Sequence, residues 1–422
     1  MDIQVNYRNK KRYKTAKYPI RQPKIITWLI KFLGRVLLIK EKYIVDNSEI
    51  KDLKSSYMLL CNHMHFVDFD LNAIATYPRK VSNVVSIDGC YRRPWLMELM
   101  GSVVTRKFTL DLHLIKSINR VLSRGDVLCM YPEARYSPCG IRSYIPDSVG
   151  KIVKKNKTPV VIGIHHGNYL RAPFWNYRQK KKVPLYYKLT YLLTAEQVEK
   201  MSVDEINKTL QDALDYNEYN YQKENNILIT EPYRANGLHK ILYQCPHCKA
   251  ENMHSKGTEI YCAECGKRWY LNADGSLIAL KGETEFSHIP DWFEWERANV
   301  VEQVKNGTYH YEDEIEVYGF PRCWRFIKLG KAKFVHDINE GITIEGFYRG
   351  KPYRMQRLPM QINSLHVEYD YRYVKPFDAF DVSSEKDSLY CYPTKRNVIT
   401  KLGFATEAIH QLAQEKINQN SK

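Results

Sequence analysis

The chain has 422 residues, of which 44% are hydrophobic, and its formal net charge is +17. The length predicts two or three domains, and the apolar content is sufficient for folded cores, which excludes a disordered chain. We expect no secretory signal, because the first apolar stretch begins only at Ile25 and no small-residue cleavage site follows it. Six of the ten cysteines are scattered singly, which favours a reducing, cytoplasmic setting.

The first forty residues form a strongly basic segment. They contain eleven Lys or Arg and a single acidic residue, Asp2. Such a block of like charge favours an anionic partner, either lipid headgroups or nucleic acid. Within it, residues 25–39 place apolar side chains at helical spacing, with Lys31 and Arg35 between them. The run is too short to span a bilayer, so we expect residues 1–40 to lie on an anionic membrane surface. The alternative is a helix packed on its own domain.

Strand and helix patterns alternate over residues 41–235, which predicts an α/β domain with helices on both faces of its sheet. We expect a helix with Thr109 as its N-cap, and a second helix from Ser202 to Tyr219 that begins with a capping box of Ser202 and Glu205. The predicted strands are residues 57–61, 83–87, 102–106, 127–131, 159–164 and 184–193.

Polar residues stand at the ends of several of these strands. Asn62 and His63 follow the first strand, and Asp68 follows five residues after His63. Ligands and catalytic groups of α/β sheets gather at the carboxyl ends of strands, so His63 is a candidate general base oriented by Asp68. A second pair with the same spacing, His65 and Asp70, overlaps the first.

Three further residues are candidates for binding an anionic substrate. Arg106 ends a strand, and Glu133 and Arg135 lie in the turn-rich loop after the strand at 127–131. Arg suits phosphate because its planar donors bind two oxygens at once.

The order of these motifs resembles the glycerolipid acyltransferases, specifically the 1-acyl-sn-glycerol-3-phosphate acyltransferases. The motifs are Asn-His-x-x-x-x-Asp at 62–68, Gly-x-x-x-x-Arg at 101–106, Tyr-Pro-Glu at 131–133 and Pro-Val-Val at 159–161. The resemblance covers about residues 25–220. The loop departs from the family's usual Phe-Pro-Glu-Gly-Thr-Arg-Ser, because Arg135 stands one position earlier than the family's arginine.

The resemblance implies a role for each candidate. His63 would take the proton from the free hydroxyl of lysophosphatidate or a related lysophospholipid as that oxygen attacks an acyl thioester, and Asp68 would orient His63. Arg106, Glu133 and Arg135 would bind the acceptor. The thioester would be acyl-CoA or acyl carrier protein.

Four of the ten cysteines form two Cys-x-x-Cys pairs thirteen residues apart. They are Cys245 with Cys248 and Cys262 with Cys265. This spacing predicts a tetrahedral, structural Zn²⁺ in a zinc ribbon over residues 240–275. A redox pair or an iron–sulfur cluster is the alternative.

Residues 276–422 are rich in strand patterns, with an amphipathic helix expected from about Ser287 to Asn306 and another from Asn397 towards Ile417. We expect a β-rich accessory domain, whose strands and terminal helix suit a small barrel of the pleckstrin-homology type.

The sequence therefore predicts an acyltransferase of phospholipid biosynthesis, cytoplasmic and peripheral on the inner face of the cell membrane. Nucleic acid is a less favoured partner than lipid. One alternative is an inactive scaffold with this fold that binds lipid or nucleic acid. Another is a metallo-hydrolase that uses His63 and His65.

Overall fold

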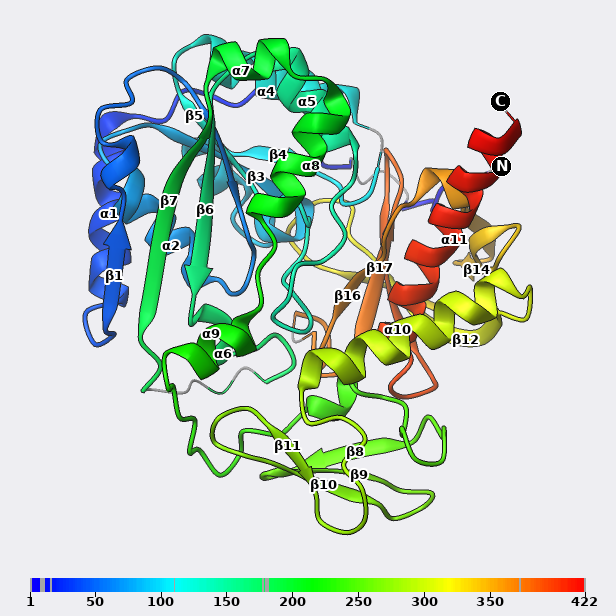
Figure 1. The fold of residues 1–422 in the computed structure, drawn as a ribbon. Helices are drawn as coiled ribbons and strands as arrows, with labels where there is room; N and C mark the ends of the chain where they lie inside the picture. The colour runs from blue at the N-terminus through cyan, green and yellow to red at the C-terminus, as the bar shows by residue number, and fades with distance from the viewer. Residues whose placement is uncertain are drawn as a thin grey trace.

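The computed structural model describes residues 2–7, 12–15, 17–109, 111–176, 178, 182–371 and 373–420. The described chain is mixed α/β and contains three sheets (Figure 1). Part of the predicted basic segment, including Arg8, Lys10 and Lys11, lies outside the described residues.

The first sheet has seven strands, and every neighbouring pair is parallel except β6 and β7. In sheet order the strands are β1 (Tyr43–Asp46), β7 (Leu185–Leu193), β6 (Val160–His166), β2 (Met58–Cys61), β5 (Val127–Met130), β3 (Val81–Ser86) and β4 (Val103–Thr105). The four residues of β2 are all buried, as expected of a strand in the middle of a parallel sheet.

Helices cover both faces of this sheet, as predicted. Met58 and Leu60 of β2 pack into a core with α4, α5, α7 and α8, whereas Leu59 and Cys61 pack with α2 on the opposite face. The helices of this part are α2 (Val67–Thr76), α3 (Pro94–Leu99), α4 (Leu112–Ser123), α5 (Ser148–Asn156), α6 (Asn168–Arg171), α7 (Ala195–Lys200), α8 (Val203–Ala213) and α9 (Glu218–Glu224). Short 3₁₀ helices η1 (Ser48–Ile50) and η2 (Ile87–Cys90) follow β1 and β3.

Two predicted helix boundaries are wrong. The N-cap of α4 is Asp111 and not Thr109, because the Asp111 carboxylate accepts the backbone N–H groups of His113 and Leu114. The helix predicted from Ser202 to Tyr219 is two helices, α8 and α9, although the capping box of Ser202 and Glu205 is present.

The second sheet contains β8 (Met253–Lys256), β9 (Glu259–Cys262), β10 (Arg268–Leu271) and β11 (Leu277–Ala279), paired in antiparallel order. It lies below the other two sheets in Figure 1. In the chain it follows the 3₁₀ helix η3 (Leu238–Lys240).

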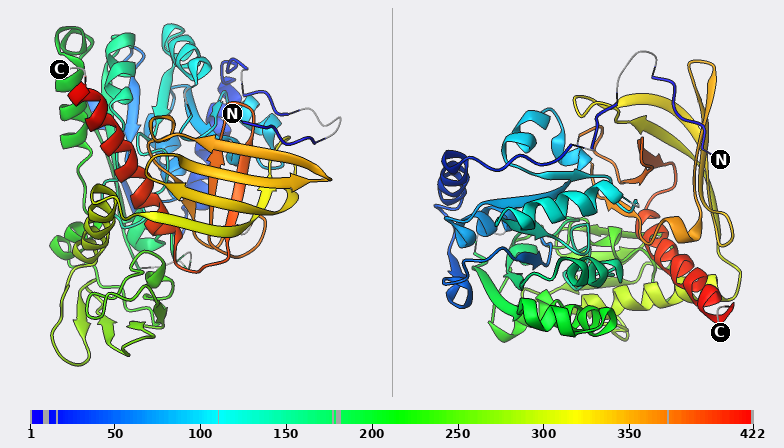
Figure 2. Two further views of the ribbon diagram at one scale, coloured as in Figure 1. Left: turned by 90° about the vertical axis from the view of Figure 1, so that its right-hand side faces the viewer. Right: turned by 90° about the horizontal axis from the view of Figure 1, so that it is seen from above.

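The third sheet has seven antiparallel strands, followed by a C-terminal helix. Its order is β15 (Lys351–Arg357), β14 (Gly341–Tyr348), β13 (Ile327–Asp337), β12 (His310–Gly319), β18 (Ser388–Pro393), β17 (Ala379–Ser383) and β16 (His366–Glu368). Helices α10 (Ile289–Lys305) and α11 (Ile399–Asn420) pack against each other beside it, and η4 (Pro359–Gln361) contacts α11. Figure 2 shows the strands curving around one side with α11 lying across them. The predicted pleckstrin-homology type stays a prediction.

The N-terminal segment before α1 (Lys24–Leu37) runs between the first and third sheets. Within this segment, Ile3 pairs with Arg354 of β15. Three cations of the segment form ion pairs with acidic residues elsewhere in the protein. These pairs are Arg12–Asp387, Lys17–Glu98 and Arg21–Asp126. Helix α1 itself packs against α2, on the side of the first sheet away from the C-terminal domain, which consists of the third sheet with α10 and α11 (Figure 1).

Candidate functional site

His63 and Asp68 are hydrogen-bonded at the carboxyl end of the central strand β2. His63 lies in the turn between β2 and α2, and Asp68 lies in the first turn of α2. The Nδ1 atom of His63 is 3.0 Å from Oδ2 of Asp68. The parallel sheet and the short turn thus bring together the base and the carboxylate that the sequence predicts.

Asp68 is fully buried and is held by three further donors. Its Oδ2 accepts the backbone N–H groups of Met64 (2.7 Å) and His65 (3.0 Å), and its Oδ1 accepts the side-chain amide of Asn168 (2.6 Å). Burial alone would raise the pKa of Asp68, but the nearby His165, the bond to His63 and the amide of Asn168 lower it to about 2. Asp68 is therefore a fixed, ionised acceptor at neutral pH.

The ring of His63 lies between aromatic side chains. It stacks on Tyr131 with a centroid distance of 3.8 Å and contacts Tyr136 at 4.2 Å, and its side chain is 20% exposed. Burial lowers the pKa of His63 below its ordinary value, although Asp68 opposes this shift. The ring is thus neutral at pH 7. When Nδ1–H donates to Asp68, the lone pair of Nε2 is available for a proton.

Two asparagines support this geometry: Asn62, which follows β2, and Asn168, which comes after β6. The side chain of Asn62 donates to the carbonyl of His165 (3.0 Å) and accepts the N–H of His165 (2.8 Å). Asn168 begins α6 directly after Gly167, at the end of β6. Sequence reasoning did not identify Asn168, Tyr131 or Tyr136, although each follows a strand of the same sheet.

The second predicted pairing, His65 with Asp70, has a different environment. Nδ1 of His65 accepts the N–H of Val67 at 3.3 Å. Burial, and then the charge of Asp68, raise the pKa of Asp70 to about 6. Among the described residues, neither His63 nor His65 belongs to a group of three side chains placed to share a metal ion.

Arg106 is buried, and its guanidinium binds the C-terminal domain and the N-terminal segment. It donates to the carbonyls of Glu385 (3.0 Å) and Lys386 (3.3 Å), to the carbonyl of Tyr13 (3.4 Å) and to Oγ1 of Thr15 (3.1 Å). Binding a phosphate through these nitrogens would require an exchange of these acceptors for phosphate oxygens.

Arg135 is also buried and also faces the C-terminal domain. Its guanidinium donates to Oγ of Ser364 (3.0 Å) and forms an ion pair with Glu407 of α11, which in turn pairs with Arg297 of α10 at 2.6 Å. The arginine of the loop after β5 therefore links the first domain to both helices of the C-terminal domain.

Glu133 is buried in the same loop and accepts the backbone N–H of Ser143 at 3.0 Å. Burial raises the pKa of Glu133 to about 7, against the opposing effect of the Ser143 hydrogen bond. Ser143 also lines a polar cavity of about 670 Å³ between this loop and helices α10 and α11. Of the five predicted residues, only His63 and Asp68 are bonded to each other.

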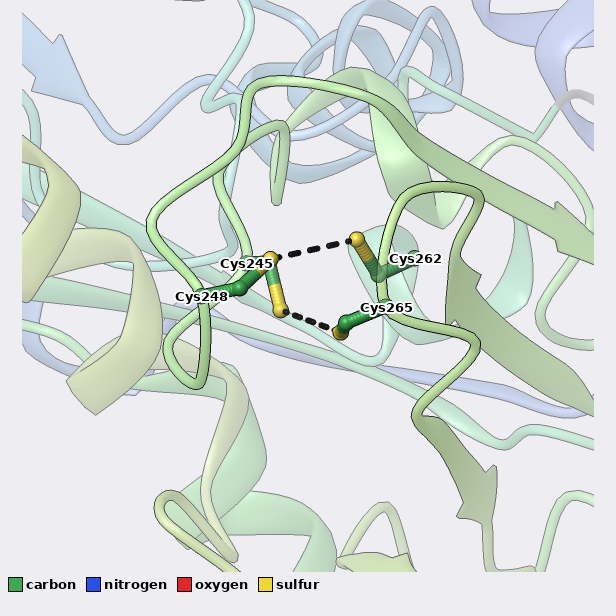
Figure 3. A group of neighbouring side chains, drawn as sticks. All are labelled: Cys245, Cys248, Cys262 and Cys265. Carbon is green, nitrogen blue, oxygen red and sulfur yellow. Dashed lines mark hydrogen bonds between the residues drawn. The ribbon is translucent and has the colours of Figure 1, made fainter.

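The four cysteines of the predicted zinc ribbon converge at one end of the second sheet (Figure 3). Their sulfur atoms all lie within 4.8 Å of one another, with Cys248 to Cys262 at 3.6 Å and Cys245 to Cys265 at 3.8 Å. A tetrahedral Zn²⁺ with Zn–S bonds of about 2.3 Å needs sulfur atoms about 3.8 Å apart. The donor set and its spacing therefore fit a structural zinc ion.

Comparison with solved structures gives distant likenesses, one of which is to an acyltransferase. The structure of PlsC from Thermotoga maritima, a 1-acyl-sn-glycerophosphate (LPA) acyltransferase, is similar over 45% of this chain and 77% of that chain, with 16% identity and a TM-score of 0.39. No family model matches the chain, and no curated protein matches it.

Proposed function

We propose that this protein is an acyltransferase that moves a fatty acyl group from a thioester to the free hydroxyl of lysophosphatidate or a related lysophospholipid. The observation that carries the proposal is the hydrogen bond between His63 and a buried Asp68 that three other donors hold in place. The sequence motifs around these residues, in the order typical of glycerolipid acyltransferases, support the same reaction class.

In this reaction the acceptor oxygen attacks the thioester carbonyl while Nε2 of His63 takes the hydroxyl proton. Asp68 stabilises the imidazolium that forms, because its carboxylate stays ionised opposite Nδ1–H. The tetrahedral intermediate then breaks its C–S bond, and the thiolate leaves and receives the proton from His63. The products are the diacyl lipid and the free thiol of CoA or acyl carrier protein.

The proposed acceptor contacts are Arg106, Glu133 and Arg135, by their match to the family motifs. The guanidinium groups of Arg106 and Arg135 already bind the C-terminal domain. The geometry therefore supports His63 as the base more strongly than it supports these acceptor contacts. A substrate role for either arginine requires its present acceptors to be displaced.

We propose that α1 binds the inner face of the cell membrane. Its outer side exposes the apolar side chains Ile25, Trp28, Leu29, Phe32, Leu33, Val36 and Leu37. Lys24, Lys31 and Arg35 lie on the same helix, and cations beside an apolar face favour an anionic leaflet. No helix of the described residues is both long and apolar enough to cross a bilayer.

We also propose that the cysteine cluster holds a structural zinc ion. Four thiolates complete the coordination sphere and leave no open position for chemistry, so the metal would stabilise the small second sheet.

The test is an assay of the purified full chain against a panel of lysolipids, with acyl-CoA and acyl carrier protein as donors. We expect formation of the diacyl lipid with release of the free thiol, and lysophosphatidate as a preferred acceptor. Absence of turnover with every donor and acceptor, together with retained vesicle or DNA binding, would favour the inactive scaffold instead.

A further inference from the structure

A second group of ionisable residues lies where the first domain meets the C-terminal domain. Asp88 comes from η2, after β3, and His366 and Glu368 come from β16. Each offers one ligand atom, and these atoms all lie within 4.8 Å of one another. The proposed acyl transfer uses none of the three.

His366 is held in the orientation of a metal ligand. The ring is 1% exposed, and its Nδ1 is hydrogen-bonded to Asp381 of β17. The Nε2 lone pair therefore points away from Asp381, and Nε2 lies 3.2 Å from Oε1 of Glu368. A carboxylate that fixes the far nitrogen of an imidazole is typical of the surroundings of bound metals.

A cationic group already lies at this position. The ammonium of Lys107 is 2.5 Å from Nε2 of His366. The ammonium thus occupies the position at Nε2 where a metal ion would bind this imidazole, and it competes with a metal for that nitrogen.

The hydroxyl of Tyr371 gives a separate indication of a missing ligand. It is buried, at 3% exposure, and has no hydrogen-bond partner among the described residues. Tyr371 packs in one core with Ile87 and Cys90, which flank Asp88 in η2, and burial raises the pKa of Tyr371. A water molecule bound to a metal ion at the cluster would donate a hydrogen bond to the oxygen of this unpartnered hydroxyl.

We propose that Asp88, His366 and Glu368 form a binding site for a divalent metal ion between the two domains. Two carboxylates and one imidazole suit Mn²⁺, Fe²⁺ or Zn²⁺, and they leave coordination positions open for water. Binding moves Lys107 away from Nε2 of His366. Because the ligands come from both domains, a bound ion also stabilises the interface between them.

The test uses full-length protein whose cysteine cluster is filled with zinc, so that only a second site takes up Mn²⁺. We titrate Mn²⁺ and follow the free ion by electron paramagnetic resonance, with the melting temperature as a second readout. We expect one saturable Mn²⁺ per chain and a rise in melting temperature, since a ligand that binds only the folded state stabilises it.

Four variants locate the site. Asp88→Asn and His366→Gln should abolish stoichiometric binding, and Asp381→Asn should weaken it about 10- to 100-fold through loss of ring orientation. Lys107→Met should bind Mn²⁺ more tightly than the wild type, because the competing ammonium is gone. The matched control is Glu312→Gln, an exposed carboxylate 4.0 Å from His310, which should leave binding unchanged.

Two results would overturn the proposal. One is the absence of a saturable Mn²⁺ site in both the wild type and Lys107→Met. The other is binding that survives both Asp88→Asn and His366→Gln in folded protein. Neither Mn²⁺ binding nor the melting temperature depends on acyl transfer. Failure of the metal-site proposal is therefore distinguishable from failure of the proposed acyltransferase function.

Discussion

Arg135 and Glu407 form an ion pair that is buried between the loop after β5 and the C-terminal helix α11. Both side chains are at most 6% exposed, and Glu407 has Arg297 as a second partner. Breaking a buried pair leaves an under-compensated charge, which costs far more than breaking a pair at the surface.

Arg135→Gln should therefore destabilise the protein by about 3 kcal/mol, measured by urea unfolding. The control is Arg142→Gln, which loses a more exposed pair with Asp215 and should cost about 1 kcal/mol or less. A higher KM for the lipid acceptor without loss of stability would contradict a stabilising role of this ion pair and leave Arg135 as an acceptor contact alone.

The pH dependence of kcat/KM should have its acidic limb below pH 6.5. Burial lowers the pKa of His63, so the folded ring stays neutral, and able to accept a proton, at pH values where an exposed histidine is largely protonated. The measurement is kcat/KM between pH 4 and 8, with protein stability checked at each pH. An acidic limb centred at or above pH 6.5 would contradict the environment described for His63.

Freshly purified protein should contain at least one zinc ion per chain, measured by elemental analysis. Cys248→Ser should lose the metal and lower the melting temperature, because the second sheet has little core of its own without it. Cys391→Ala is the control, since Cys391 lies in β18 and is not part of the cluster. Well under one zinc per chain in the wild type would count against a structural zinc site.

Replacing Trp28 and Phe32 together by Ser should weaken binding to vesicles that contain anionic lipid. Each side chain is about half exposed on α1, and burying it in the interface contributes about 1 kcal/mol, so the double variant should bind about tenfold more weakly or worse. Trp324→Ser is the matched control, as Trp324 is an exposed tryptophan of the C-terminal domain. Equal binding of all three proteins would show that α1 does not contact the membrane.

Local patterns predict the parts of this structure that depend on near neighbours in sequence. The apolar run at 57–61 predicts β2, which the structure has at Met58–Cys61, and the five-residue spacing of His63 and Asp68 predicts their pairing, because one turn joins the strand to α2. The cysteine cluster is predictable for the same reason: two short knuckles carry all four sulfur atoms.

The roles of the buried arginines could not be predicted this way. Arg106 binds the carbonyl of Glu385, and Arg135 pairs with Glu407, more than 270 positions later in each case. No periodicity or motif indicates such partners, because they come from the docking of separate domains. The cluster of Asp88, His366 and Glu368 was missed for the same reason, and β1 was missed because its four residues are too short for a clear pattern.

The most direct test of the account is the rate of acyl transfer to lysophosphatidate by His63→Ala compared with His65→Ala. Both variants remove an imidazole from the same turn, but only His63 is bonded to Asp68. With both proteins shown to be folded by their melting curves, we predict that His63→Ala loses transfer and His65→Ala retains it. Transfer that persists in His63→Ala at the wild-type rate would contradict the assignment of His63 as the base.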